Sequence, residues 1–293
     1  MTKLHGLGTA LITPFTQNGS VDYIALDRLL DTQLDGNIDY IVVLGTTGEA
    51  TTLTAEEKQQ VRRHIVEYVG GRLPLVLGLG GNCTEQVITD LKAMRNELIL
   101  DFTAILSVCP YYNKPSQEGL FQHFCAIAEA SPIPVILYNV PGRTGVNLLP
   151  ETVMRIHEAH PDKIVGIKEA SGNLDQIKDL ISRKLSTVNC QLSIISGDDG
   201  IACEVMQAGG AGLISVASNA FTRDFHSIVH DKNEALQGKY TDMIRLLFAE
   251  GNPVGIKVVL SQKGIISNAL RLPLVPASQA LQTQIAQELT KIQ

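Results

Sequence analysis

Hydrophobic residues along this chain gather in short, nearly continuous runs, separated by longer stretches of mixed polarity. The runs are rich in β-branched residues, and such runs are typical of parallel strands that are covered on both faces. The sequence therefore predicts eight strands, at residues 7–13, 40–44, 75–79, 102–106, 135–138, 164–168, 192–196 and 212–216.

The stretches between these runs carry signals for the start of a helix. Thr54-Ala-Glu-Glu57 has the form of a capping box, Ser116 opens a second helix, and Pro150 suits the first turn of a third. Strand and helix alternate eight times by about residue 220, which favours an α/β fold of the closed (β/α)8 TIM-barrel type. An open, doubly wound sheet is the alternative.

The strand signal stops after Phe221. The remaining segment predicts three or so helices, with breaks near residues 251–253 and 272–276. We therefore expect a barrel at residues 1–221 that carries the active site, followed by a C-terminal helical subdomain at residues 222–293.

The composition of the 293-residue chain excludes several classes of protein. A formal net charge of -6 and the lack of any basic cluster argue against a nucleic-acid-binding surface. The apolar runs are shorter than the roughly 20 residues that span a bilayer, so we expect no membrane association. The cysteines form no CxxC pair, which argues against a disulfide framework or a zinc site and points to a reduced, cytoplasmic protein. They are Cys83, Cys109, Cys125, Cys190 and Cys203.

Lys168 closes the sixth predicted strand, within Ile164-Val-Gly-Ile-Lys-Glu-Ala-Ser-Gly172. An amine at the end of a buried strand is poorly hydrated, and desolvation disfavours its charged form. Because a neutral amine can attack a carbonyl carbon, Lys168 is a candidate Schiff-base nucleophile. A lysine that ends a strand and simply reaches solvent is the plainer alternative.

Other strand ends carry polar motifs, and barrel enzymes place their chemistry at these ends. Gly45-Thr-Thr-Gly-Glu49 offers hydroxyls and tightly turned amides that suit an anion. Tyr138 ends the fifth strand and could hold or move a proton beside Lys168. Arg143, in the loop that follows, could clamp a carboxylate. The structural alternatives are an ordinary turn, a buried tyrosine bonded to a carbonyl and a surface arginine.

Two further motifs have mainly structural interpretations. The adjacent Tyr111 and Tyr112 follow the fourth strand, where packing or an interface is the usual role. Asp198 and Asp199 follow the seventh strand, and we expect them to cap a helix because no histidine or further acid accompanies them. We assign no metal.

Taken together, the motifs resemble those of the pyruvate-dependent class I aldolases, and most closely those of the dihydrodipicolinate synthase family. The similarity spans the whole chain, including Asn252-Pro253 and residues 270–273. The matching motifs are Gly45-Thr-Thr-Gly-Glu49, Pro110-Tyr-Tyr-Asn-Lys-Pro-Ser-Gln117, Leu137-Tyr-Asn-Val-Pro-Gly-Arg-Thr-Gly145, Gly166-Ile-Lys-Glu-Ala-Ser-Gly172 and Ser196-Gly-Asp-Asp199.

The resemblance implies a lyase that needs no cofactor, because the substrate pyruvate forms a covalent imine with Lys168. The derived enamine would add to the aldehyde of L-aspartate 4-semialdehyde, in the first committed step of the diaminopimelate and lysine pathway. Tyr138, Thr46 and Tyr112 would form the proton relay. Tyr112 would reach the site of a neighbouring subunit, in a homotetramer built as a dimer of dimers.

The resemblance also implies how the substrates are held. Thr47, together with Thr46, would bind the pyruvate carboxylate, and backbone carbonyls of Gly197 and Ile214 would line the site. Arg143 would face the carboxylate of the semialdehyde. N-acetylneuraminate lyases are similar here but carry an uncharged residue in place of this arginine. A related aldolase that uses another aldehyde, such as a sugar acid, is therefore the main alternative, and a barrel that binds small molecules without turnover is a second.

Regulation is where the chain departs from relatives that lysine inhibits. Tyr111 and Asn82 match the allosteric lysine pocket of those relatives. At four other positions of that pocket, lysine-inhibited relatives usually carry hydroxyl, imidazole or carboxylate groups. This chain has Ala50, Ala55, Lys58 and Gln86 there. We expect weak or absent inhibition by lysine, because two ammonium groups require acceptors and negative charge.

Overall fold

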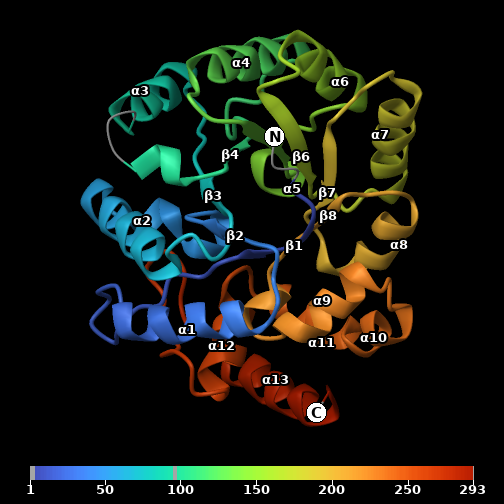
Figure 1. Cartoon of the computed structure of the whole chain (residues 1–293). Coiled ribbons are helices and arrows are strands. Elements are labelled where there is room, and N and C mark those ends of the chain that lie inside the picture. Colours follow the sequence, from blue (N-terminus) through green and yellow to red (C-terminus); the bar gives the residue numbers. More distant parts are fainter. Residues whose placement is uncertain (1–3, 95–97, 293) are drawn as a thin grey trace. The chain divides into compact units, whose positions relative to one another are not determined.

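The eight strands of the chain follow one another in sequence order around a closed parallel barrel. This arrangement comes from a computed structural model, which describes residues 4–94 and 98–292. Each strand is followed by at least one α-helix, as the sequence predicts (Figure 1). The strands are β1 (Gly6–Ala10), β2 (Tyr40–Val43), β3 (Leu75–Gly78), β4 (Ala104–Val108), β5 (Val135–Asn139), β6 (Ile164–Glu169), β7 (Ser193–Ser196) and β8 (Gly212–Ser215).

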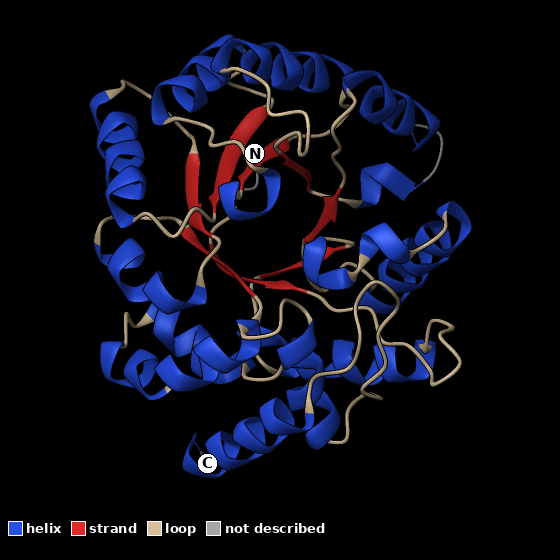
Figure 2. Ribbon diagram, turned by 180° about the vertical axis from the view of Figure 1, so that it is seen from behind, coloured by secondary structure: helices blue, strands red, loops and turns tan. Residues whose placement is uncertain are grey.

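The helices differ in length, and short 3-10 turns lie between several of the elements. Figure 2 shows the chain from behind, with strands in red and helices in blue. The α-helices are α1 (Tyr23–Asp35), α2 (Ala55–Val69), α3 (Thr84–Met94), α4 (Gln117–Ala130), α5 (Pro141–Thr144), α6 (Pro150–Ala159), α7 (Leu174–Ser186), α8 (Ala202–Gln207), α9 (Thr222–His230), α10 (Glu234–Lys239), α11 (Thr241–Phe248), α12 (Val254–Gln262) and α13 (Gln279–Ile292).

The predicted helix starts are confirmed. Thr54 accepts a hydrogen bond from the amide of Glu57, whose carboxylate accepts one from the amide of Thr54, so the capping box is complete. Ser116 accepts a hydrogen bond from the amide of Gly119, and Pro150 occupies the first turn of α6. The eight strands begin and end within three residues of the predicted runs, because a strand that is buried on both faces leaves a local apolar signature.

Two compact units can be distinguished within the chain. The first consists of the segment up to Gly6 together with Pro74–Ile214, and the second consists of Leu7–Leu73 together with the segment from Ser215 onward. In the first unit, β5 and β6 pair in parallel with Tyr138 opposite Lys168. In the second unit, β1 and β2 pair with Gly8 opposite Tyr40. A β-carbon on Gly8 would lie 2.2 Å from the buried Tyr40 ring, so this close approach requires glycine.

The C-terminal segment contains more helices than the sequence predicts. We expected three or so, whereas residues 222–292 form five, from α9 to α13. The predicted breaks near residues 251–253 and 272–276 are confirmed. Two additional breaks fall at Lys232, which has φ 53°, and at Tyr240, which separates α10 from α11. Neither position is a glycine or proline, so local sequence signals do not reveal them.

The domain boundary that we predicted between residues 221 and 222 stays a prediction. The outer ends of the two predicted domains, at residues 1–3 and 293, lie outside the described residues. Within the part of the chain that the structure describes, no helix combines the length and apolarity needed to cross a bilayer.

Candidate active site

The Lys168 side chain lies beside the Tyr138 ring at the carboxyl ends of β5 and β6. Its Nζ atom is 4.6 Å from the ring centroid, and the lysine as a whole is only 6% exposed. Register explains the proximity, because parallel pairing sets the two residues opposite each other and their side chains on the same face of the sheet. The structure thus brings together the two residues that the sequence analysis chose as nucleophile and proton carrier.

Gly197 lies directly against the lysine. A β-carbon built on it would be 2.9 Å from Cε and 3.1 Å from Cγ of Lys168, and 2.5 Å from Cβ of Ala170. Only glycine therefore leaves room for the extended lysine side chain. The Gly197 amide donates to the Glu169 carbonyl over 2.7 Å, which fixes the backbone at this approach. Ile214 is buried within β8, in the same compact unit.

The opposite face of these two strands carries a polar network that the sequence analysis did not select. The fully buried Glu169 carboxylate accepts hydrogen bonds from Asn139 Nδ2 at 2.9 Å, from Gln176 Nε2 at 3.0 Å and from the Ser171 amide at 2.8 Å. Because side chains alternate along a strand, this network lies behind the lysine and the tyrosine and braces their backbone. The adjacent polar pairs Tyr-Asn and Lys-Glu at the two strand ends are the signal that could have revealed it.

Tyr112 and Arg143 lie in the first unit, and both residues are exposed. Tyr112 is 90% exposed and has φ 76°, a conformation that is uncommon for a bulky residue. Its amide donates to the Thr144 carbonyl over 3.4 Å. Arg143 belongs to the short helix α5, which follows β5 directly. The structure therefore places Tyr112 in the loop after β4, whereas Arg143, which we expected in a loop, belongs to a one-turn helix after β5.

Thr46 and Thr47 belong to the second unit, in the 3-10 turn η1 (Thr46–Gly48) that follows β2. The Thr46 side chain is exposed, whereas Thr47 is buried. The Thr47 hydroxyl oxygen accepts a hydrogen bond from Asn252 Nδ2 over 3.0 Å. Asn252 belongs to a segment whose sequence matches the family, and its sequence alone indicated no role for it.

A buried ion pair supports the same turn. Lys257 Nζ lies 2.5 Å from Glu49 Oε1, and both side chains are almost completely inaccessible to solvent. The lysine also donates to the Ala269 carbonyl over 2.9 Å, and its Nζ atom is 4.2 Å from the Phe15 ring centroid. Burial lowers the pKa of Lys257 to about 8, and the neighbouring Glu49 carboxylate opposes this decrease.

Of the paired aspartates after β7, Asp198 has the capping role that the sequence predicts, whereas Asp199 lies inside the turn. Asp198 accepts a hydrogen bond from the Gly200 amide over 2.8 Å and caps the short turn η4 (Asp199–Ile201). Within residues 4–94 and 98–292, no group of three or more histidine, cysteine, aspartate or glutamate side chains is arranged to hold a metal ion.

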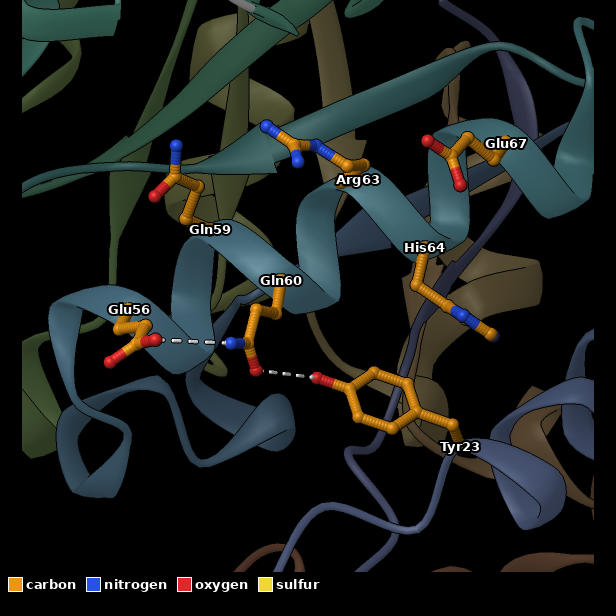
Figure 3. A pocket seen from close by; sticks show the side chains of 7 residues that line it. All are labelled: Tyr23, Glu56, Gln59, Gln60, Arg63, His64 and Glu67. Carbon is orange, nitrogen blue, oxygen red and sulfur yellow. Dashed lines mark hydrogen bonds between the residues drawn. The ribbon is translucent and has the colours of Figure 1, made fainter.

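A polar hollow of about 510 Å³ lies between α1 and α2 in the second unit (Figure 3). Its side chains largely pair with one another: Tyr23 donates to Gln60, and Gln60 donates to Glu56. None of the predicted site residues lines this hollow, so we assign the candidate active site to the strand ends. The lining residues are Tyr23, Glu56, Gln59, Gln60, Arg63, His64 and Glu67.

The closed eight-stranded barrel defines the class of protein, the TIM barrel, and a buried lysine ends one of its strands. Enzymes of this fold carry their reactive groups at the carboxyl ends of the strands. Residues 3–292 match the Dihydrodipicolinate synthetase family. A 4-hydroxy-tetrahydrodipicolinate synthase of Parabacteroides distasonis is 50% identical over 281 residues, which cover 94% of this chain and 92% of that protein.

Solved structures agree with this match. The crystal structure of dihydrodipicolinate synthase from Thermotoga maritima is 37% identical, with a TM-score of 0.93 and 99% of each chain covered. The chloride-inhibited dihydrodipicolinate synthase from Acinetobacter baumannii, complexed with pyruvate, is 38% identical, with a TM-score of 0.91 and 98% of each chain covered. This chain belongs to the dihydrodipicolinate synthetase family and is an enzyme of the lyase class.

Proposed function

We propose that the chain condenses pyruvate with L-aspartate 4-semialdehyde to give 4-hydroxy-tetrahydrodipicolinate, through an imine between pyruvate and Lys168. The observation that carries this proposal is the contact between the buried lysine and Tyr138, with Gly197 leaving space along the lysine side chain. Its relatives are named for this product, and one similar structure is a complex with pyruvate.

The reaction uses the amine as a nucleophile, and the protonated imine that it forms is the temporary electron sink. Lys168 Nζ attacks the ketone carbon of pyruvate, and loss of water forms the imine. The positive charge of the protonated imine favours loss of a proton from the methyl group, which gives an enamine. The enamine carbon forms the new bond to the aldehyde carbon of the semialdehyde. The amine of the semialdehyde then displaces Lys168 and closes the ring, so the lysine is regenerated and no cofactor is required.

Tyr138 carries protons on the imine side, since its ring lies against the lysine. Thr46 and Tyr112 complete the relay, and Thr47 holds the pyruvate carboxylate together with Thr46. The exposed ring of Tyr112 supports a role across a subunit interface. In this proposal the enzyme is a cytoplasmic homotetramer, a dimer of dimers, in which Tyr112 enters the site of a neighbouring subunit.

Arg143 selects the second substrate. Arg143 is exposed and lies in α5, the helix that follows the strand of Tyr138. Its guanidinium group can form paired hydrogen bonds with the carboxylate of the semialdehyde. Replacement of Arg143 by Ala should raise the KM for the semialdehyde roughly 10- to 100-fold, as expected for a charged hydrogen bond, and should leave imine formation with pyruvate intact. If the variant loses imine formation with pyruvate as strongly as it loses use of the semialdehyde, the arginine has another role. Faster turnover of a sugar-acid aldehyde than of the semialdehyde by the native chain would favour the alternative aldolase.

Borohydride reduction in the presence of pyruvate tests the mechanism directly. We expect one reduced pyruvyl adduct per chain, located on the peptide that contains Lys168 by mass mapping. Lys168→Ala should form no adduct, whereas Lys178→Ala, a change on the exposed side of α7, should form it normally. An unchanged mass after reduction, or an adduct on a different side chain, would refute the proposal.

A further inference from the structure

Asn252 and Thr47 are 205 residues apart in the sequence and meet in the interior of the second unit. Asn252 Nδ2 donates to Thr47 Oγ1 over 3.0 Å. Asn252 is 8% exposed and Thr47 is 3% exposed, so both groups are protected from water. A buried hydrogen bond of this kind fixes the rotation of the threonine side chain.

The direction of this hydrogen bond determines what the hydroxyl can still do. A threonine hydroxyl has one hydrogen to donate and two lone pairs that accept, whereas an amide nitrogen only donates. Because Asn252 already donates to the Thr47 oxygen, the single hydrogen of Thr47 must point to a different acceptor. A carboxylate is such an acceptor, and a hydrogen bond to it is stronger than a neutral one.

The backbone of the turn is fixed independently of this hydrogen bond. Thr13 Oγ1 donates to the Gly48 carbonyl over 2.7 Å. Glu49 adopts a left-handed conformation with φ 50° and forms the buried ion pair with Lys257. These contacts hold the position of Thr47 Cα, which leaves the direction of its hydroxyl hydrogen as the property that Asn252 controls.

Stability alone does not explain an amide at this position. Asn252 Oδ1 is buried and accepts no hydrogen bond from the described residues. A buried acceptor without a donor destabilises a folded protein by about 1–3 kcal/mol.

We propose that Asn252 is a positioning residue, which holds the Thr47 hydroxyl as a hydrogen-bond donor toward the carboxylate of the 2-oxo acid that forms the imine. The proposal rests on the proposed function, because it requires a 2-oxo acid beside this turn. Asn252 does not touch the substrate in this arrangement and acts only through Thr47.

Three variants test this assignment by borohydride trapping over a range of pyruvate concentrations. Asn252→Ala removes the donor and should raise the half-saturating pyruvate concentration about three- to tenfold, the effect of a neutral hydrogen bond. Asn252→Asp keeps the shape but makes the group an acceptor, which draws the Thr47 hydrogen away, so we expect an increase of roughly 10- to 100-fold. Thr47→Val removes only the hydroxyl and should match that larger increase.

A double-mutant cycle on Asn252 and Thr47 distinguishes a positioning role of Asn252 from a contribution to the stability of the fold. In a Thr47→Val background, Asn252→Ala should raise the half-saturating concentration less than twofold further, since the hydroxyl that it directs is gone. Asn268→Asp is the matched control, because Asn268 also has a buried Oδ1 without a donor among the described residues. That control should leave pyruvate saturation unchanged, and far-UV circular dichroism checks the folding of each variant.

The outcomes distinguish this inference from the proposed function. If the native chain traps no adduct on Lys168, the proposed function fails. If the native chain traps pyruvate and Thr47→Val saturates at the native concentration, the inference fails together with the carboxylate-binding role of Thr47, whether or not the Asn252 variants fold, while the condensation through Lys168 still stands. Fully additive effects of Asn252→Ala and Thr47→Val would also overturn it.

Discussion

Lys257→Met should destabilise the protein more strongly than loss of any surface lysine. The change keeps most of the apolar side chain and removes the amine that lies 2.5 Å from Glu49 Oε1. The Glu49 carboxylate would remain buried, with the Arg271 amide, 3.3 Å from Oε2, as the remaining donor among the described residues. A buried charge that loses its partner cannot be hydrated, so its desolvation is no longer offset.

The expected loss follows from the burial of the pair. Removing one member of a fully buried ion pair destabilises a protein by about 3–5 kcal/mol. For a chain of this size, each kcal/mol lowers Tm by roughly 2 °C, so Tm should fall by about 6–10 °C. The double variant Lys257→Met/Glu49→Gln removes both charges and should recover at least half of that loss, because no uncompensated charge remains.

Urea unfolding followed by circular dichroism measures these differences. The experiment is best done at pH 6.5, below the lowered pKa of about 8 for Lys257, so that the native lysine is protonated. Lys178→Met on the exposed side of α7 is the control and should change stability by less than about 0.5 kcal/mol. The reasoning is refuted if Lys257→Met unfolds within 1 kcal/mol of the native chain, or if the double variant is less stable than the single one.

Three further predictions concern catalysis, acid stability and regulation. Tyr138→Phe should lower kcat by a factor on the order of 10² to 10³, with the imine still trapped by borohydride, and a kcat within fivefold of the native value would contradict its role as a proton carrier. Burial lowers the pKa of His123 to about 4, so the folded form stays neutral while the unfolded form, with a pKa near 6.5, gains a proton. Stability should therefore fall by up to about 3 kcal/mol as the pH decreases from 6.5 to 4, and His123→Gln should lose this part of the pH dependence in urea unfolding. L-lysine at low-millimolar concentration should leave turnover nearly unchanged, because Lys58 repels its ammonium groups and Gln86 supplies no negative charge to attract them. Half-inhibition in that concentration range would show the prediction to be wrong.

The fold was predictable from the sequence because its signals are local. Each buried strand is a continuous apolar run, and helix starts such as Thr54 and Ser116 carry their own capping residues. The breaks at Lys232 and Tyr240 were not predictable, because ordinary residues adopt the required conformations there under tertiary constraints. This is why the C-terminal segment has five helices rather than three or so.

The residues of the candidate site also fall into two groups, those that could be predicted from the sequence and those that could not. Lys168 and Tyr138 could be chosen from the sequence, since each ends a strand and parallel register sets them opposite each other. Asn252 and Lys257 could not be chosen, because their partners Thr47 and Glu49 lie about 200 residues earlier in the chain. Such contacts depend on the folded backbone and leave no short motif in the sequence.

The alternation of side chains at the ends of β5 and β6 has a consequence for redesign. Positions 138 and 168 share one side of the paired strands, where we propose that the chemistry takes place, while positions 139 and 169 on the reverse side form a bracing network. A mutant library aimed at new aldehydes can therefore vary the segment around Arg143 while keeping Asn139 and Glu169 constant. Random changes at those two positions would disturb the alignment of the lysine and the tyrosine, and screens would discard these clones as inactive whatever their pocket shape.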